Sequence, residues 1–381
     1  MLDAARAADL DVAFAPGFLL DGEPSPELTG AACAAAADAD VTIVFLGLPA
    51  ARESEGYDRD TISLPSNQLA LLEALRTVSR QLVVVLANGS VVSLEEVRQH
   101  ADAIVESWLG GQAMAEGVLD VLLGKVNPSG KLSETIPLRL EDSPSYLSFP
   151  GELGRSHYSE GIFVGYRGHD RRGSDVAYPF GFGLSYSTFS MSIDDVEIEG
   201  KGSAATCSVV VNVQNTGDVA GAEVVQLYVG DEEATVAKPP RELRDFAKVH
   251  LAPGEASTVT FNLTGRDFAH WHEPLSRWVV EGGRFSLDIG SSSRHIADTA
   301  WVSLEGDDLR QPLTVMSTLG ELMRDPVVGD EFRAIIEAQP EQFQRQAPDI
   351  PAITFVDFNI FELDREGLND LLQRANQHRG A

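Results

Sequence analysis

The sequence has few cysteines and no long apolar run, and both absences narrow the class of protein. Only two cysteines, Cys33 and Cys207, occur in 381 residues, far apart and in apolar settings, so we expect buried thiols and no disulfide framework. No stretch of about 18 apolar residues is present, which argues against a membrane span. The first residues lack the basic start and apolar core of a signal peptide. We therefore expect a cytoplasmic protein without membrane spans.

Positive charge is also scarce, with 29 Lys and Arg against 58 Asp and Glu and a formal net charge of −29. Phosphates would be repelled, so neither nucleic acid nor an anionic membrane is an expected partner. The charge favours a neutral or cationic ligand. We find no nucleotide-binding loop and no His spacing typical of a metal site, so no cofactor and no metal are expected; His270 and His272 are better interpreted as a surface pair.

Residues 1 to about 185 alternate short apolar runs with helical patterns. Helices are predicted near 4–8 and over 31–39, 66–78, 93–99 and 114–123, and strands over 10–14, 41–48, 82–86 and 103–107. Strands that alternate with helices indicate a layered α/β sandwich with a mainly parallel sheet. We assign residues 1–189 to this domain.

The second part of the chain has a different pattern. Alternating apolar and polar positions at 208–214, 223–229 and 257–263, with turn signals between them, predict six or seven strands of an antiparallel β-sandwich over 190–306. Residues 307–381 form a helical extension, with helices predicted over 318–323, 330–338 and 366–375. Its apolar patch at 353–361 is expected to pack on a preceding domain or on the partner subunit of a homodimer.

A dense charged loop follows the predicted strand 41–48. Three carboxylates and two guanidiniums surround one glycine in this loop: Arg52, Glu53, Glu55, Gly56, Asp58 and Arg59. The loop lies at the carboxyl end of a buried parallel strand, where ligands and catalytic groups collect in open α/β sheets. A solvated loop whose Arg and Glu side chains pair with each other fits the spacing equally well.

Five motifs, in order, resemble the C-terminal half of family 3 glycoside hydrolases of the β-glucosidase type. They are EGYDR at 55–59 with LP and NQ at 64–68, WLGGQ at 108–112, NPSGKL at 127–132, YSEGIFVGYR at 158–167 and YPFGFGLSYSTF at 178–189. The segments NTG at 215–217, VQLYV at 225–229, PREL at 240–243 and LAPG at 251–254 are similar to the fibronectin type III-like domain that follows in this family.

The resemblance implies roles for several residues. Glu55 matches the family's general acid/base, on a loop that reaches over the mouth of a (β/α)8 barrel, and Glu53 is the runner-up. Asp58 and Arg59 are interpreted as loop-shaping or substrate-binding residues. Trp108 could face the cleft or the core. Tyr158, Tyr166 and Arg167 are candidates for contact with the barrel.

The family places a (β/α)8 barrel before these domains, and the barrel carries the Asp nucleophile. A barrel needs about 250 residues, which this chain does not provide. We therefore interpret the chain as the C-terminal part of a retaining β-glucosidase-like hydrolase, with a start that is truncated relative to the family. It would act on a carbohydrate together with a barrel, which a separate chain could supply. The alternative is a non-catalytic module that binds sugar or protein; an exposed apolar face on the α/β domain would favour the enzyme.

Overall fold

The structure, a computed structural model, describes residues 1–358, 360 and 363–377. It divides into two compact units, and each is described by itself. The first comprises Met1–Glu199, Thr206–Leu263 and Gly283–Ser303. The second comprises Gly200–Ala205, Thr264–Gly282 and the chain from Leu304 onward. The domain boundaries predicted at 189/190 and 306/307 stay predictions.

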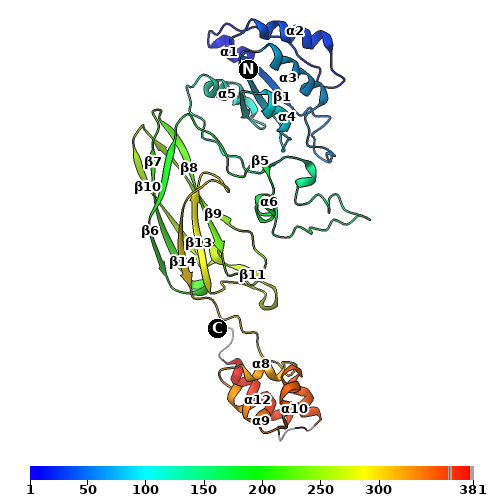
Figure 1. The fold of residues 1–381 in the computed structure, drawn as a ribbon, viewed down its shortest axis with the longest axis vertical. Coiled ribbons are helices and arrows are strands. Elements are labelled where there is room, and N and C mark those ends of the chain that lie inside the picture. Colours follow the sequence, from blue (N-terminus) through cyan, green and yellow to red (C-terminus); the bar gives the residue numbers. More distant parts are fainter. Residues whose placement is uncertain (359, 361–362, 378–381) are drawn as a thin grey trace. The chain divides into compact units, whose positions relative to one another are not determined.

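The N-terminal part of the first unit is a parallel α/β sheet, as predicted. Strands β1 (Thr42–Gly47), β2 (Leu82–Ala87) and β3 (Ala103–Glu106) pair in that order. Helices α2 (Pro26–Ala37), α3 (Ser66–Val78) and α4 (Glu95–His100) cover one face, and α1 (Leu2–Ala7) packs against α5 (Met114–Leu122) (Figure 1).

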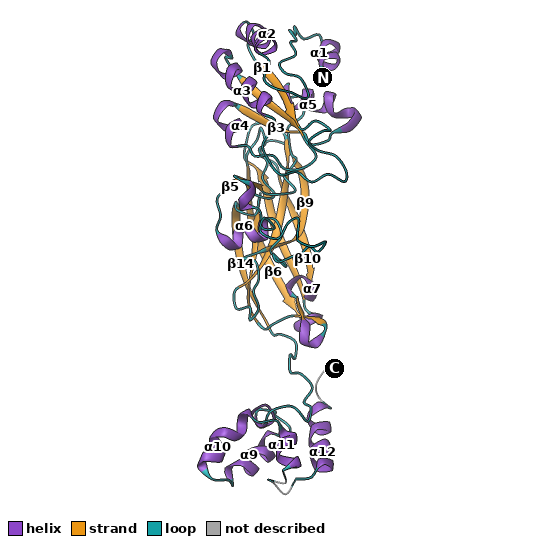
Figure 2. Cartoon of the chain, turned by 90° about the vertical axis from the view of Figure 1, so that its right-hand side faces the viewer, coloured by secondary structure: helices purple, strands orange, loops and turns teal. Residues whose placement is uncertain are grey.

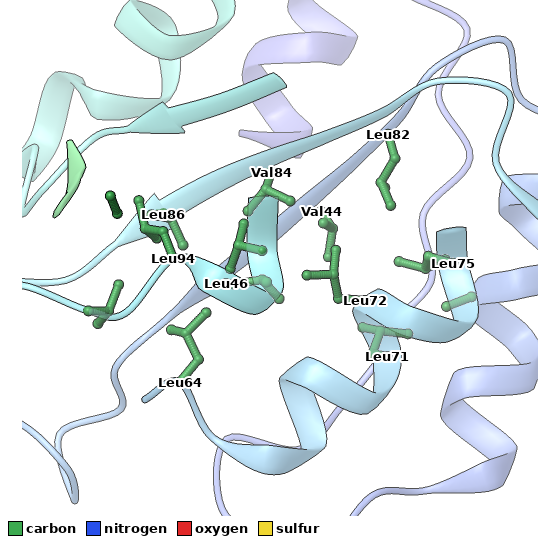
Figure 3. Close-up of a cluster of buried hydrophobic side chains, with 14 of the residues drawn as sticks. Val44, Leu46, Leu64, Leu71, Leu72, Leu75, Leu82, Val84, Leu86 and Leu94 are labelled. Atoms are coloured by element: carbon green, nitrogen blue, oxygen red, sulfur yellow. The ribbon is translucent and has the colours of Figure 1, made fainter. Parts of the chain in front are cut away.

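The core of this part lies between the sheet and the helices on that face. Figure 3 shows leucine and valine side chains of β1, β2 and α3 pointing toward one another. Leu72 and Val84 are fully buried. Burial of such side chains contributes about 1.5–3 kcal/mol each, so this core fixes the sheet that carries the charged loop.

The strand predicted over residues 10–14 is wrong. Leu10 instead donates its amide to the carbonyl of Ala5 at the end of α1, and Phe14 is 68% exposed. The described sheet runs only from β1 to β3, so this segment has no neighbouring strand with which to form a ladder. The apolar residues of this segment resemble those of a buried strand, but the segment does not pair with the sheet.

The rest of the first unit is the predicted antiparallel β-sandwich. One sheet has the order β10 (Ala256–Thr264), β7 (Thr206–Asn215), β6 (Phe189–Glu199). The other has the order β14 (Ile296–Leu304), β13 (Gly283–Gly290), β8 (Gly221–Asp231), β9 (Glu242–Leu251). Figure 2 draws the long strands of this part in orange. Alternate residues of β7 are fully buried, such as Val209 and Val211, as expected where one face of each sheet meets the other.

The segment between α5 and β6 joins the α/β part to the sandwich. It contains β4 (Ile136–Pro137), α6 (Tyr166–Arg172) and β5 (Val176–Tyr178). Tyr166 stacks on Phe180 and its hydroxyl accepts the amide of Leu243 at 2.8 Å, while Arg167 lies 3.3 Å from Glu242. Tyr166 and Arg167 thus contact the sandwich, and their predicted contact with a barrel stays a prediction.

The second unit contains helix α7 (Gly265–Phe268), a hairpin and a helical cluster. Strands β11 (His270–His272) and β12 (Arg277–Val279) form the hairpin. The helices are α8 (Leu319–Met323), α9 (Gly329–Glu337), α10 (Glu341–Gln346), α11 (Ala352–Asp357) and α12 (Arg365–Asn376). They enclose a core of their own, which includes Phe332 and Leu368.

The sequence pattern missed α10 and α11. Phe355, from the patch at 353–361, is buried in the helical core, whereas Phe358 is 74% exposed; residues 359 and 361 lie outside the described ones. The predicted homodimer through this region stays a prediction. Among the residues that the structure describes, no helix has the length and apolar character needed to span a bilayer.

Candidate functional site

The charged loop begins where β1 ends, against the end of β2. A side chain at Gly47 would lie 2.0 Å from the carbonyl oxygen of Ala87, so only glycine fits. Gln68, buried at the start of α3, accepts the Gly47 amide at 2.9 Å and donates to its carbonyl at 2.8 Å. Asn67 donates to the carbonyl of Leu19. Gln68 therefore ties the beginning of the loop to the start of α3, and Asn67 ties that helix to the segment before α2.

Glu55 lies in the middle of this loop and its side chain is exposed. The next residue, Gly56, has a φ of +74°, a left-handed conformation that favours glycine. No donor among the described residues bonds to the Glu55 carboxylate. The carboxylate is therefore accessible to a ligand, as a proton donor must be.

Glu53 has a different environment, because its carboxylate folds back onto the loop after β2. One oxygen accepts the Gly89 amide at 2.6 Å and the other accepts the Ser90 hydroxyl. Partial burial alone would raise the pKa of Glu53, but these bonds and the nearby Arg59 outweigh it and leave the pKa lowered. A carboxyl held in its ionised form and engaged by two donors of the chain is poorly suited to act as a general acid.

Arg59 and Asp58 differ in their contacts. The Arg59 guanidinium donates to the carbonyl of Val91 at 2.6 Å, and so it fastens the far end of the loop to the same segment that holds Glu53. Asp58 is exposed and forms no ion pair within the described part of the chain. The structure gives Arg59 a loop-shaping contact, and it leaves the role proposed for Asp58 a prediction.

Trp108 follows β3 and is half-buried. Its φ of +49° is a left-handed conformation, which costs about 1–2 kcal/mol for a residue with a side chain. The Trp108 amide donates to Glu106 at 3.0 Å, and this bond supports the turn. Glu106 also accepts a long hydrogen bond, 3.4 Å, from the fully buried Asn88.

The sequence patterns did not identify two further glutamates near the charged loop, Glu106 and Glu134, as site residues. Burial raises the pKa of Glu106 to about 7, and the negative charges of Glu134 and Glu53 add to this, against the bonds from Trp108 and Asn88. Burial also raises the pKa of Glu134. One signal was available for Glu106: a glutamate closes the apolar run of β3 at the same sheet edge as the charged loop.

The raised pKa of Glu106 predicts that Glu106→Gln increases the free energy of unfolding relative to the native chain at neutral and alkaline pH, but not at acidic pH. The folded state keeps a proton between pH 4.5, the ordinary pKa, and about 7, while the unfolded state releases it, so the stability of the native chain falls over this window. We expect the variant to gain about 2–3 kcal/mol at about pH 8 and nothing from this source at about pH 4. Urea unfolding at both pH values measures it, and an equal difference at both would contradict it.

A small cavity lies beside the charged loop, with a volume of about 170 Å³. Its lining includes Arg52, Tyr57, Arg59 and Ser63, so polar and aromatic groups of the loop face it. Within the ranges described above, no three His, Cys, Asp or Glu side chains are placed to hold a metal ion. The arrangement as a whole presents the exposed Glu55 carboxylate on a loop with fixed ends.

Two known protein domains match most of the chain. Residues 6–186 match the glycosyl hydrolase family 3 C-terminal domain, and residues 223–293 match a fibronectin type III-like domain. The first match contains the charged loop, the Trp108 turn and the junction segment. The second covers most of the sandwich.

Individual relatives are glycoside hydrolases, in agreement with these domain matches. The exo-alpha-(1->6)-L-arabinopyranosidase of Bifidobacterium longum is 48% identical over 341 residues, 89% of this chain and 44% of its own length. Thermostable beta-glucosidase B of Acetivibrio thermocellus is 39% identical over 96% of this chain and 50% of its own length. The crystal structure of the Bifidobacterium adolescentis GH3 beta-glucosidase superposes with a TM-score of 0.81 at 48% identity and covers 87% of this chain and 49% of that one.

Two facts follow from the coverage. The chain spans about half the length of the curated relatives that it matches. The alignment with the Acetivibrio protein leaves out only 4% of this chain, so it includes most of the helical segment from residue 307 onward, for which the sequence offered no motif. That segment is therefore shared with a relative.

Proposed function

Because the chain belongs to glycoside hydrolase family 3, we propose that it forms the C-terminal part of a retaining β-glucosidase-like enzyme in which Glu55 is the general acid/base. The observation that carries the proposal is the exposed Glu55 carboxylate on a loop fastened at both ends, inside the segment that matches the family. Glu53, by contrast, is engaged with Gly89 and Ser90.

The proposed chemistry assigns two steps to Glu55. A retaining enzyme needs two carboxyl groups about 5–5.5 Å apart, one as nucleophile and one as acid/base. Glu55 would protonate the departing glycosidic oxygen while the nucleophile, which we place on a (β/α)8 barrel, forms the glycosyl-enzyme. Glu55 would then take a proton from the water that hydrolyses this intermediate. The fixed ends of the loop limit where the carboxylate can reach, which lowers the entropic cost of both transfers.

The names of the relatives suggest the substrate class. They include beta-glucosidases and an arabinopyranosidase, so we propose a neutral pyranoside, with β-glucosides first and α-L-arabinopyranosides second. A neutral sugar is compatible with a net charge of −29, since no anionic substrate has to approach an acidic surface.

The barrel has a candidate docking surface in the long loop before α6 (Figure 1). Seven apolar side chains of this loop are between 42% and 101% exposed: Tyr146, Leu147, Phe149, Leu153, Tyr158, Ile162 and Val164. Apolar side chains gathered in this way are typical of a protein–protein contact. We propose that they contact a (β/α)8 barrel, in the same polypeptide or in a separate one, and this exposure favours the enzyme over a binding module.

Reconstitution tests the proposed function. We expect the purified chain to be inactive on p-nitrophenyl β-glucoside and to support hydrolysis when mixed with the barrel domain of the Bifidobacterium adolescentis enzyme, because the nucleophile then comes from the barrel. The Leu153→Asp variant should weaken the complex in size-exclusion chromatography. Turnover by the chain alone would show that it supplies its own nucleophile. A stable but inactive complex would favour the non-catalytic module.

A further inference from the structure

Three loops that leave the carboxyl edge of the sheet are connected to one another by hydrogen bonds. They are residues 52–59 after β1, residues 88–91 after β2, and residues 107–111 after β3, whose last residue is Glu106. The middle loop takes part in both of the loop-to-loop connections described below. Its position therefore determines how the other two lie.

The first connection joins the loop of Glu55 to the middle loop. Glu53 accepts the amide of Gly89 and the hydroxyl of Ser90, and Arg59 donates to the carbonyl of Val91. A side chain at Gly89 would approach the Glu53 carboxylate to 3.2 Å, so glycine permits the close contact. These contacts lie on either side of Glu55 and fix both flanks of its position.

The second connection joins the Trp108 turn to the middle loop through Glu106. One Glu106 oxygen accepts the Trp108 amide and the other accepts the side-chain amide of Asn88, which also donates to the carbonyl of Ser90 at 3.0 Å. Ser107 adds a bond to the carbonyl of Leu86 at 2.5 Å. Glu106 is therefore the side chain through which the strained Trp108 turn and the middle loop are held together.

We propose that Glu106 is a positioning residue, which holds the Trp108 turn against the middle loop and, through that loop, fixes the segment that carries Glu55. The effect on the reaction rests on the proposed function, whereas the effect on the loops does not. Three ionisable groups interact with this cluster: Glu53 from the first loop, Glu134 from the segment before β4, and Arg59, which offsets both.

Glu134 provides a matched control. It is also a glutamate near Glu106, and burial raises its pKa as well, but within the described residues it accepts no hydrogen bond from any of the three loops. A change at Glu134 therefore alters the charge of the cluster without removing a connection between loops.

Hydrogen exchange of the full chain, followed by mass spectrometry, tests the connection. Glu106→Ala should accelerate exchange in peptides that contain the Trp108 amide by about fivefold, the loss expected when an intramolecular hydrogen bond is removed, with a smaller increase in residues 52–59. Glu106→Gln keeps an acceptor for Trp108 and should restore most of the protection. Glu134→Ala should leave the Trp108 peptide unchanged. Unchanged exchange in a folded Glu106→Ala chain would overturn the proposal, as would equal effects of Ala and Gln.

Kinetics of the same variants in the barrel complex test the consequence for the reaction. Glu106→Ala should lower kcat about tenfold or more with little change in KM, because a displaced loop misplaces the proton donor, and Glu106→Gln should recover most of it. A wild-type complex without turnover would refute the proposed function while leaving the exchange result intact. Loosened loops with unchanged kcat would refute the positioning role alone.

Discussion

In the active barrel complex, Glu55→Gln is expected to lower kcat on p-nitrophenyl β-glucoside by about 10²–10⁴, the contribution of a general acid/base. The substitution keeps the size of the side chain but removes the proton that assists the departing oxygen. Because the Glu55 side chain is exposed and holds no other part of the chain, the variant should unfold at the same urea concentration as the native protein. A large loss of activity without a loss of stability separates a chemical role from a structural one.

A substrate with a better leaving group separates the acid step of Glu55 from its base step. A dinitrophenyl leaving group needs little protonation, so the glycosyl-enzyme should still form rapidly in the Glu55→Gln variant. The second step would then be slow, since water attack needs a base. Azide needs none, and it should attack the intermediate and release a β-glycosyl azide. We expect azide to raise turnover of this variant several-fold.

Glu53→Gln serves as the control. It also neutralises a carboxylate of the same loop, and it should reduce activity by loosening the contact with Gly89 and Ser90. Azide should not restore it, because Glu55 still supplies the acid and the base. Rescue of Glu53→Gln and not of Glu55→Gln would reverse the assignment of the two residues.

The elements of the fold were largely readable from local patterns. The alternation of apolar runs with amphipathic helices predicted β1, α3 and β2 almost to the residue. Burial of one face of a helix, or of both faces of a strand, gives the apolar residues a characteristic spacing that can be recognised in the sequence. The failed strand at 10–14 shows the limit of this reasoning. A short apolar run becomes a strand only if another strand lies beside it, and that depends on the whole fold.

The site was readable only in part for the same reason. A charged loop after a buried strand, together with the family motif, was enough to select Glu55. The roles of Glu53 and Glu106 depend on how the ends of β1, β2 and β3 meet, and residues 53, 90 and 106 are far apart in the sequence. Glu106 also carries a cost in stability, as expected where a site needs a group that the fold disfavours.

Several motif residues proved to serve the junction with the sandwich and not the charged loop. Lys131, in the NPSGKL motif, lies 2.7 Å from Glu223 of β8 and donates to the carbonyl of Gly183 at 2.9 Å. The two side chains are only 10% and 8% exposed. Little water reaches this ion pair to screen or hydrate its charges. Each buried charge is therefore stabilised mainly by the other, and removal of one leaves the other uncompensated.

Lys131→Met is therefore expected to lower the free energy of unfolding by about 3–5 kcal/mol, because it leaves the Glu223 carboxylate buried without its partner. Lys201→Met is the matched control: Lys201 pairs with Glu305 at 3.0 Å, but the side chains are 68% and 73% exposed, so we expect a loss below about 1 kcal/mol. Adding Glu223→Gln to Lys131→Met should recover part of the loss, since the uncompensated charge is gone. Urea denaturation measures all three variants, and equal effects of the two lysine substitutions would show that the junction does not depend on this pair.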